Sequence, residues 1–169
     1  MPDTTYFSVC PSPVGSLLLL SNGRALTGLY MEDQRHGLTF NPAWTRDDAL
    51  LAPAREQLAA YFAGELTEFD LPLAPEGTPF QRDVWKQLRA IPYGCTISYG
   101  ELARRVGKPS ASRAVGAANG RNPLGVIVPC HRVIGANGSL TGYGGGLDRK
   151  KQLLGLEAEV LARRGQRLL

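Results

Sequence analysis

The chain has 169 residues and a hydrophobic fraction of 43%, which suffices for one domain or for a small lobe joined to a larger one. It lacks both a run of about 18 apolar residues and the pattern of a signal peptide, so we expect no membrane span and a cytoplasmic protein. Its three cysteines, Cys10, Cys95 and Cys130, have no metal-site spacing, and their odd number argues against a disulfide scaffold and for a reducing compartment.

The net charge of +4 is divided unevenly along the chain. Residues 1–78 hold 4 Lys+Arg and 10 Asp+Glu, a net of −6, whereas residues 79–169 hold 15 and 5, a net of +10. The second half is therefore where a polyanion such as a nucleic acid would dock. The alternative is a dipolar surface that has no charged partner.

Strand-like segments come first in the chain. Residues 6–9, 16–20 and 25–30 are apolar and are bounded by turn residues, which predicts a small antiparallel sheet. Asn22-Gly23 lies between the last two and predicts a type I′ hairpin turn, in which both central residues have positive φ. Residues 32–47 are polar, and they give no assignment.

A helix is predicted over residues 48–62, because apolar residues recur there at helical spacing and Gly64 follows. Pro53 falls near its start, where proline is tolerated. Residues 71–77 are proline-rich and are interpreted as a linker. The charge of the chain changes sign just after this segment.

The second half opens with a series of helix signals. Thr78-Pro79-Phe80-Gln81 is a capping box, and the helix that it starts should run to Ile91. Ser98 and Glu101 form a second capping box, with a helix to Gly107. Ser110 is then expected to cap a third helix over residues 111–120. Two helices joined by about three residues predict a helix-turn-helix.

The third of these helices is unusual because small side chains dominate it. Arg113 is its only long side chain before Arg121. Small residues allow another surface to approach closely, which could be a neighbouring helix or a nucleic-acid backbone with Arg113 projecting beyond it.

Residues 126–128, Val-Ile-Val, predict a buried strand that ends at Pro129, because proline cannot donate a ladder hydrogen bond. Cys130 follows at once, then His131 and Arg132. An imidazole or a cation beside a thiol lowers its pKa, and the thiolate is the nucleophile. Adjacent side chains of a strand point to opposite faces, so either a turn or a water must connect Cys130 with His131. The alternative is a buried, unreactive cysteine.

The C-terminal segment supplies a glycine-rich loop and a last helix. Residues 141–146, Thr-Gly-Tyr-Gly-Gly-Gly, match neither a dinucleotide-binding nor a phosphate-binding pattern, so we predict no cofactor. Asn137-Gly138 before them is a second hairpin signal. A helix is expected over residues 147–156, and Glu157 near its C-terminal end would be unfavourable to the helix dipole, which indicates a partner elsewhere. A solvated surface glutamate is the alternative.

Taken together, the second half resembles the O6-alkylguanine-DNA alkyltransferases, also called methylated-DNA–protein-cysteine methyltransferases. The resemblance covers residues 77–157 and is loose over the first 76 residues. It is carried by these motifs: Thr78-Pro79-Phe80-Gln81, Ser98-Tyr99-Gly100-Glu101-Leu102-Ala103, Ser112-Arg113-Ala114-Val115-Gly116, Asn119-Gly120-Arg121-Asn122-Pro123, Pro129-Cys130-His131-Arg132-Val133 and Thr141-Gly142-Tyr143.

The resemblance implies an α+β protein with two lobes. Residues 1–76 would form a small N-terminal α/β lobe, an antiparallel sheet plus a helix, that is ribonuclease-H-like. Residues 77–169 would form a mostly helical C-terminal lobe that contains the helix-turn-helix and the alkyl acceptor. The implied partner is double-stranded DNA carrying O6-alkylguanine, and also O4-alkylthymine, bound as a monomer through the minor groove with the damaged base flipped out of the stack.

The resemblance also assigns roles to individual residues. Cys130 would accept the alkyl group once and irreversibly, after His131, held by Glu157, takes the thiol proton through a water. Tyr99 would assist the leaving guanine, Asn122 would brace the turn at Cys130, and Arg113 would replace the flipped base. The implied DNA contacts are Ser98, Tyr99, Arg113, Ala114, Gly116, Ala117 and Arg121. The implied substrate pocket is formed by Val133, Tyr143 and Gly144.

Two departures and three alternative functions stay open at this point. Gly144 stands where some relatives carry a hydroxyl side chain, which predicts a looser pocket that tolerates bulky alkyl groups. Some relatives bind zinc in the first lobe, but Cys10 and His36 are too few ligands, so we predict no metal. The alternatives are a non-enzymatic damage-binding protein of the alkyltransferase-like type, a sequence-specific transcription factor and a cysteine hydrolase with turnover.

Overall fold

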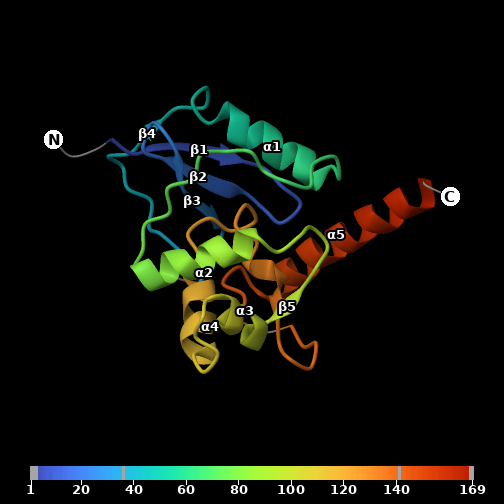
Figure 1. The fold of residues 1–169 in the computed structure, drawn as a ribbon. Helices are drawn as coiled ribbons and strands as arrows, with labels where there is room; N and C mark the ends of the chain where they lie inside the picture. Colours follow the sequence, from blue (N-terminus) through green and yellow to red (C-terminus); the bar gives the residue numbers. More distant parts are fainter. Residues whose placement is uncertain (1–3, 36, 141, 168–169) are drawn as a thin grey trace.

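A four-stranded sheet forms the centre of the N-terminal lobe (Figure 1). In the computed structural model, which describes residues 4–35, 37–140 and 142–167, its spatial order is β3-β2-β1-β4. The bounds are Tyr6–Cys10 for β1, Leu17–Ser21 for β2, Leu26–Met31 for β3 and Thr45–Arg46 for β4. The first three strands pair antiparallel, as predicted, whereas β4 pairs parallel with β1 and was hidden in the polar segment 32–47.

The turn between β2 and β3 differs from the predicted type I′. Gly23 has a φ of 96°, but Asn22 is not among the described residues with positive φ. The Asn22 side chain instead accepts hydrogen bonds from the N–H groups of Arg24 and Ala25, both at 2.9 Å. This asparagine stabilises a wider loop through its own side chain, which competes with the two-residue turn.

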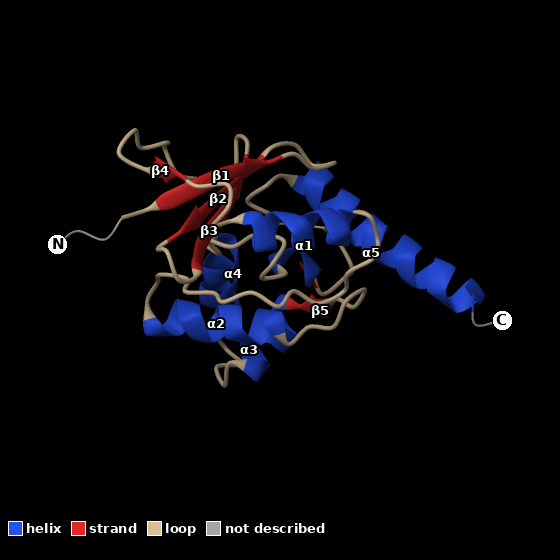
Figure 2. Ribbon diagram, turned by 90° about the horizontal axis from the view of Figure 1, so that it is seen from above, coloured by secondary structure: helices blue, strands red, loops and turns tan. Residues whose placement is uncertain are grey.

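Helix α1, Ala52–Phe62, lies along one face of the sheet (Figures 1 and 2). Its Leu58 and Tyr61 side chains are fully buried, as are Leu17 and Leu19 of β2. The predicted linker is not free, because Leu26 of β3 donates to the Pro72 carbonyl and accepts from the Ala74 N–H. One hydrophobic core runs through both lobes, and the Leu29 N–H of β3 donates to the Pro123 carbonyl, so the sheet directly contacts the segment that leads to Cys130.

Three helices build the front of the C-terminal lobe: α2, Pro79–Arg89; α3, Tyr99–Arg105; and α4, Ser112–Gly120. The capping box of Thr78 with Gln81 is present. Ser98 caps α3, but the Glu101 carboxylate bonds to Arg104 and Arg105. Helices α3 and α4 pack together with six residues between them.

The predicted cap of α4 is wrong. Ala111 occupies the N-cap position and makes no side-chain cap hydrogen bond, and the Ala111 N–H donates to the Lys108 carbonyl. A tight turn over residues 108–111 therefore leads into the helix, and Ser110 lies too early in the chain to cap it.

The last helix, α5, spans Leu147–Arg167 and is longer than predicted. Residues 157–164 are good helix formers, and the buried residues Lys150, Leu153, Glu157 and Val160 recur at helical spacing. Its C-terminal part extends away from the body of the molecule (Figures 1 and 2). In the part of the chain that the structure describes, no helix is both long and apolar enough to cross a membrane.

The Asn137-Gly138 signal produces a turn but no hairpin. The Gly135 N–H donates to the Ser139 carbonyl, and Gly138 has a φ of 83°. The strand before it, β6, Val133–Ile134, pairs in parallel with β5, Ile97–Ser98, which directly precedes α3. This pairing brings the start of α3 beside the segment that follows Cys130.

Candidate active site

The segment before Cys130 is a buried turn, and the predicted strand over residues 126–128 is wrong. Val126 has a φ of 70°, which a β-branched residue rarely adopts. The Asn122 side chain explains the turn, because its Nδ2 donates to the Val128 carbonyl at 2.8 Å and its Oδ1 accepts from the Leu124 N–H at 3.0 Å. The Asn122 side chain thus links Leu124 and Val128 across this turn. Apolar content alone could not distinguish a buried strand from a buried turn.

Cys130 begins a short 3₁₀ helix, Cys130–Arg132, which directly follows Pro129. The residue is only 7% exposed, and burial raises the pKa of its thiol, although the Asn122 amide and the Lys150 charge act in the opposite direction. A buried thiol of this kind is protonated at rest. It therefore needs a base nearby before it can act as a nucleophile.

His131 is that candidate base. It is completely buried, and its Nε2 lies 2.7 Å from Oε2 of Glu157. Burial lowers the pKa of the imidazole more than Glu157 raises it, so the ring is neutral at pH 7 and Nε2 carries the proton that it donates to the carboxylate. The other ring nitrogen, Nδ1, then has a free lone pair, and it is buried with no hydrogen-bond partner among the described residues.

Glu157 is held by several donors. Arg132 donates to both of its oxygens, at 2.9 and 3.0 Å, Tyr61 donates at 2.6 Å, and the Gly94 N–H donates at 3.1 Å. Burial alone would raise the pKa of this carboxyl, but the hydrogen bonds from His131 and Arg132 hold it at about 2. Glu157 is thus an anion that fixes both the orientation and the tautomer of His131.

The partner predicted for Glu157 is therefore present, and the solvated surface glutamate is ruled out by its full burial. The reason given for that partner was wrong, because α5 continues ten residues beyond Glu157 and the residue does not lie at the helix end. Helical spacing from Leu153 places it on the buried face of α5.

Lys150 is a residue of the site that the sequence did not indicate. Its side chain is fully buried, and its Nζ donates to the Val133 carbonyl at 2.5 Å. Burial lowers the pKa of this lysine, while its charge favours the thiolate form of Cys130. The only available signal was its helical spacing to Leu153, which marks a buried position but gives no chemistry.

A small cavity of about 10 Å³ lies in front of Cys130. Its lining includes the predicted residues Tyr143 and Gly144 together with Asn119 and Asn122. Gln34 of the N-terminal lobe also lines it. A cavity of this size holds at most one water molecule, so a purine base enters only after the walls move apart.

The N-terminal lobe forms part of this closed wall. The Arg35 N–H donates to the Gly144 carbonyl at 2.7 Å. A Cβ at position 144 would lie 3.3 Å from the Arg35 carbonyl oxygen and 3.6 Å from that of Gly120. Glycine at this position therefore permits close approach of two backbone segments, and the tolerance of bulky alkyl groups expected for Gly144 stays a prediction.

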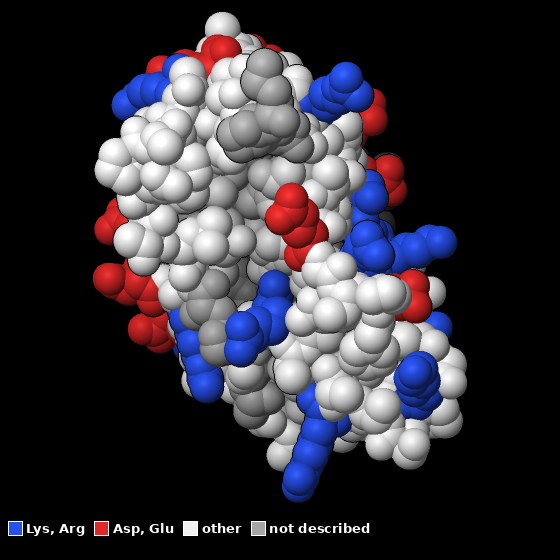
Figure 3. Space-filling view, turned by 90° about the vertical axis from the view of Figure 1, so that its left-hand side faces the viewer, with Lys and Arg blue, Asp and Glu red and all other residues white. Residues whose placement is uncertain are grey.

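The outer face of α4 is exposed to solvent, unlike the residues around Cys130. Arg113, Ala114, Ala117 and Arg121 are all exposed, whereas Val115 and Ala118 on the opposite side are buried. The small residues of α4 therefore divide: Ala118 is buried where α4 packs against α2 and α3, whereas Ala114 and Ala117 are exposed and leave room for another surface to approach. Figure 3 shows Lys and Arg side chains projecting from the lower part of the molecule, which is the C-terminal lobe.

Tyr99 connects this face with the cavity loop. It is the first residue of α3, and its ring lies 3.7 Å from the position that a Cβ of Gly116 would occupy. A Cβ at Gly142 would lie 3.0 Å from the Tyr99 hydroxyl. Ser98, which caps α3, is half-buried next to it. Thr141 lies outside the described residues.

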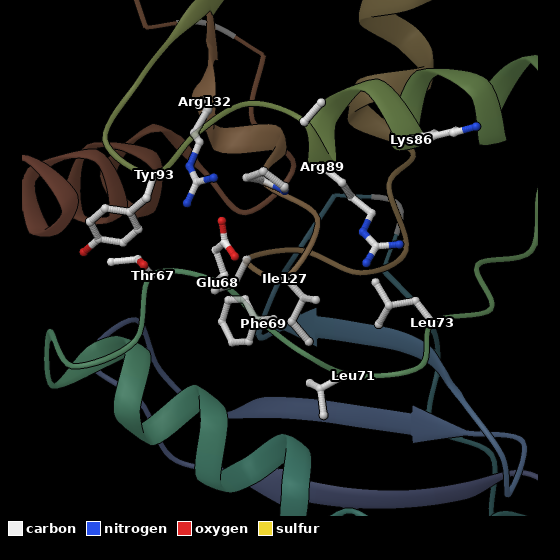
Figure 4. A pocket seen from close by; sticks show the side chains of 13 residues that line it. Thr67, Glu68, Phe69, Leu71, Leu73, Lys86, Arg89, Tyr93, Ile127 and Arg132 are labelled. Atoms are coloured by element: carbon white, nitrogen blue, oxygen red, sulfur yellow. The ribbon is translucent and has the colours of Figure 1, made fainter.

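A second, larger cavity of about 420 Å³ lies between the lobes on the other side of the active-site turn (Figure 4). Ile127 and Arg132 contribute to its wall, as do Phe69 and Arg89, but Cys130 and His131 do not. It thus reaches the rear of the turn without reaching the thiol. Local sequence patterns do not indicate this cavity, because its walls come from segments that are distant in the chain.

Metal ligands are not clustered in the described part of the chain, where no group of three or more His, Cys, Asp or Glu side chains could hold an ion. His36, one of the two residues considered for zinc, lies outside the described residues. The arrangement that the structure does contain is a buried thiol, an oriented neutral imidazole and a buried carboxylate, which together define a cysteine-nucleophile site.

Comparisons with known proteins agree with this class. Residues 5–75 match the ribonuclease-like domain of the 6-O-methylguanine DNA methyltransferases, and residues 79–159 match the DNA-binding domain of the same family. A methylated-DNA–protein-cysteine methyltransferase of Mycolicibacterium paratuberculosis is 58% identical over 149 residues, which cover 86% of this chain and 88% of the relative. A relative of the same name from Methanosarcina acetivorans is 51% identical and covers 90% of this chain and 97% of its own length.

Solved structures give the same result. The crystal structure of the Mycobacterium tuberculosis O6-methylguanine methyltransferase has a TM-score of 0.84 and 53% identity, covering 92% of this chain and 94% of that chain. The crystal structure of the M. tuberculosis OGT in complex with DNA has a TM-score of 0.86 and 54% identity over the same shares. The chain belongs to the 6-O-methylguanine DNA methyltransferase family, also named methylated-DNA–protein-cysteine methyltransferases.

Proposed function

We propose that this chain reverses alkylation damage in DNA by moving an alkyl group from O6 of guanine to Cys130. The sulfur forms a bond to the alkyl carbon while the carbon–O6 bond breaks, and its electron pair leaves with the guanine. The thioether is not regenerated, so each molecule acts once. The observation that carries this proposal is Nδ1 of His131, which has no hydrogen-bond partner among the described residues, on a ring that Glu157 orients and that follows the buried Cys130 in the chain.

The proposed proton steps use the same groups. His131 takes the thiol proton at Nδ1 through a water, and the resulting imidazolium is stabilised by Glu157. Tyr99 donates its hydroxyl hydrogen toward the leaving base, and the positive charge of Lys150 favours the thiolate. Asn122 keeps the turn rigid, so that the sulfur stays in place during the attack. The backbone of Val133 and Gly144 contacts the base edges.

Duplex DNA is the proposed partner, bound through the minor groove by a monomer with the damaged nucleotide flipped out. A base inside the stack hides its O6 substituent, so it must leave the stack at a cost of a few kcal/mol. Arg113 replaces it and recovers part of that cost. The exposed small residues of α4 permit the close approach that this contact needs, and Ser98, Gly116 and Arg121 flank it.

We also propose that the division into functional lobes lies at residues 76 and 77. The C-terminal lobe would contain every residue that touches DNA, and O4-alkylthymine would be a second substrate. The N-terminal lobe supplies Tyr61 to Glu157 and Arg35 to Gly144. Its proposed role is therefore to support the site and to cover it between encounters with DNA.

Intact mass measurement tests the alkyl transfer directly. The protein is incubated with a duplex oligonucleotide that contains one O6-methylguanine, and the expected result is the gain of one methyl group, which peptide mapping assigns to Cys130. Cys95, which is exposed, serves as an internal control for nonspecific methylation. Cys130→Ser should bind the same duplex and gain no mass. DNA binding by the wild type without any gain of mass would instead favour the damage-binding function.

A further inference from the structure

Asn119 has an unusual hydrogen-bonding position in the last turn of α4. Its side chain is only 1% exposed, and its Nδ2 donates to the Cys130 carbonyl at 3.4 Å. Its Oδ1 is buried and accepts no hydrogen bond from any described residue. Because the amide nitrogen is the atom that faces the carbonyl, the oxygen is fixed as the free acceptor.

An unpaired buried acceptor is costly, since the group has lost its water without gaining a donor. Asn119 lines the same small cavity as Cys130, Tyr143 and Gly144. The Asn119 Oδ1 shares its carbon with the nitrogen that reaches the Cys130 carbonyl, so the two oxygens are neighbouring acceptors of residues that line this cavity. Such a pair of acceptors fits a ligand group with two N–H donors.

O6-alkylguanine has one such group. Alkylation at O6 removes the proton from N1, and N9 is bonded to the sugar, so the only N–H donors of the damaged base are those of its exocyclic 2-amino group. We infer that Asn119 is a base-selecting residue, whose Oδ1 accepts a hydrogen bond from the 2-amino group of the flipped guanine. This inference rests on the proposed function, because it needs the guanine to enter the Cys130 cavity.

Selectivity between substrates follows from this contact. O4-alkylthymine and O6-alkylhypoxanthine have no amino group, so either base would leave Asn119 Oδ1 unpaired in the complex. Sites that pair a buried polar group with the substrate discriminate strongly against analogues that lack the donor. Transfer from O6-methylhypoxanthine should therefore be about 10-fold to 100-fold slower than transfer from O6-methylguanine in the same duplex.

A double comparison of two substrates with two forms of the protein tests the inference. Single-turnover rate constants are measured for both bases in one duplex sequence, with the wild type and with Asn119→Leu, which is close in size but has no acceptor. The expected result is a loss of about 10-fold or more on O6-methylguanine and little change on O6-methylhypoxanthine, so that the preference for guanine disappears. Asn119→Asp, which keeps an acceptor oxygen, should retain the preference even where both rates fall.

Several outcomes would overturn it. Equal losses on both bases with Asn119→Leu would show that Asn119 only supports the Cys130 turn. Equal losses accompanied by a shifted pH profile would show that it acts on the thiol and not on the base. A wild type that repairs both bases at the same rate would also contradict it. These results differ from failure of the proposed function itself, in which the wild type would methylate Cys130 with neither substrate.

Discussion

The cluster around Glu157 and the cavity in front of Cys130 adjoin each other, but they are completed in opposite ways. Glu157 accepts five hydrogen bonds from protein groups and is fully buried. In contrast, His131 Nδ1 and Asn119 Oδ1 have no partner in the described chain, and the cavity in front of Cys130 measures only about 10 Å³. The hydrogen bonds of Glu157, which orients the general base His131, are thus complete before substrate binds. The atoms proposed to meet the thiol and the substrate keep a free hydrogen-bonding position. In His131 and in Asn119, one side-chain atom is held by the protein, and the other is left for the reaction or the substrate.

The largest effect is expected from breaking the satisfied cluster. Glu157→Ala removes the partner of a buried arginine and of His131, so we expect a loss of about 3–5 kcal/mol in the free energy of unfolding. Alkyl transfer should fall below detection, because His131 loses its orientation and its tautomer. Urea denaturation and a single-turnover assay measure the two effects. A stable and active Glu157→Ala protein would contradict the assignment.

Tyr61→Phe is the matched milder change to the same cluster. It removes one hydrogen bond to Glu157 from the N-terminal lobe and leaves Arg132 and His131 in place. A loss of about 1.5–3 kcal/mol in stability is expected, since the acceptor is charged. A transfer rate that falls together with stability would show that the N-terminal lobe supports the chemistry. An unchanged rate would limit its role to folding.

Arg113→Ala tests the proposed DNA-binding role of the exposed face of α4. Arg113 is exposed on the outer face of α4, so its replacement should not affect stability, but the residue is proposed to replace the flipped base. Repair of a methylated duplex should slow by about 10-fold to 100-fold, the rate equivalent of a stacking contact worth about 1–3 kcal/mol. Reaction with free O6-benzylguanine, which needs no flipping, should stay the same. Similar losses on both substrates would exclude the base-replacing role.

The pH dependence of the free energy of unfolding tests the low pKa of Glu157. The folded pKa of Glu157, about 2, lies below its ordinary value of 4.5, so its contribution is present above pH 4.5 and is lost as the pH falls toward 2. The pKa of His131 is also lowered by burial, so protonation of the unfolded chain begins to reduce stability below pH 6.5. The stability gap between wild type and Glu157→Gln should therefore narrow from pH 4.5 to 2. Chemical denaturation at a series of pH values measures it, and a constant gap would contradict the low pKa.

The sequence predicted the satisfied cluster less well than the reactive residues. Cys130, His131 and Asn122 come from a short stretch whose motifs resemble a family, and the helix caps at Thr78 and Ser98 depend on neighbours in the chain. The hydrogen bond from Lys150 to Val133 and the one from Tyr61 to Glu157 join residues that are far apart in the sequence. Local sequence patterns therefore do not predict them. Residues 126–128 were predicted wrongly because burial gives the same apolar run to a strand and to a turn that the Asn122 side chain holds.

The smallest expected effect concerns the wall of the cavity. Gly144→Ser places a side chain between the carbonyl oxygens of Arg35 and Gly120, 3.3 and 3.6 Å from the new Cβ. Both are backbone atoms, so the N-terminal segment must shift by a few tenths of an ångström, and we expect only a several-fold change in rate, about 1 kcal/mol in the barrier. Transfer from O6-benzylguanine should become slower than in the wild type, while transfer of a methyl group should change less. Markedly faster benzyl transfer would instead show that Gly144 keeps the closed wall in place and that loosening this wall, by displacing Arg35, is what admits bulky groups.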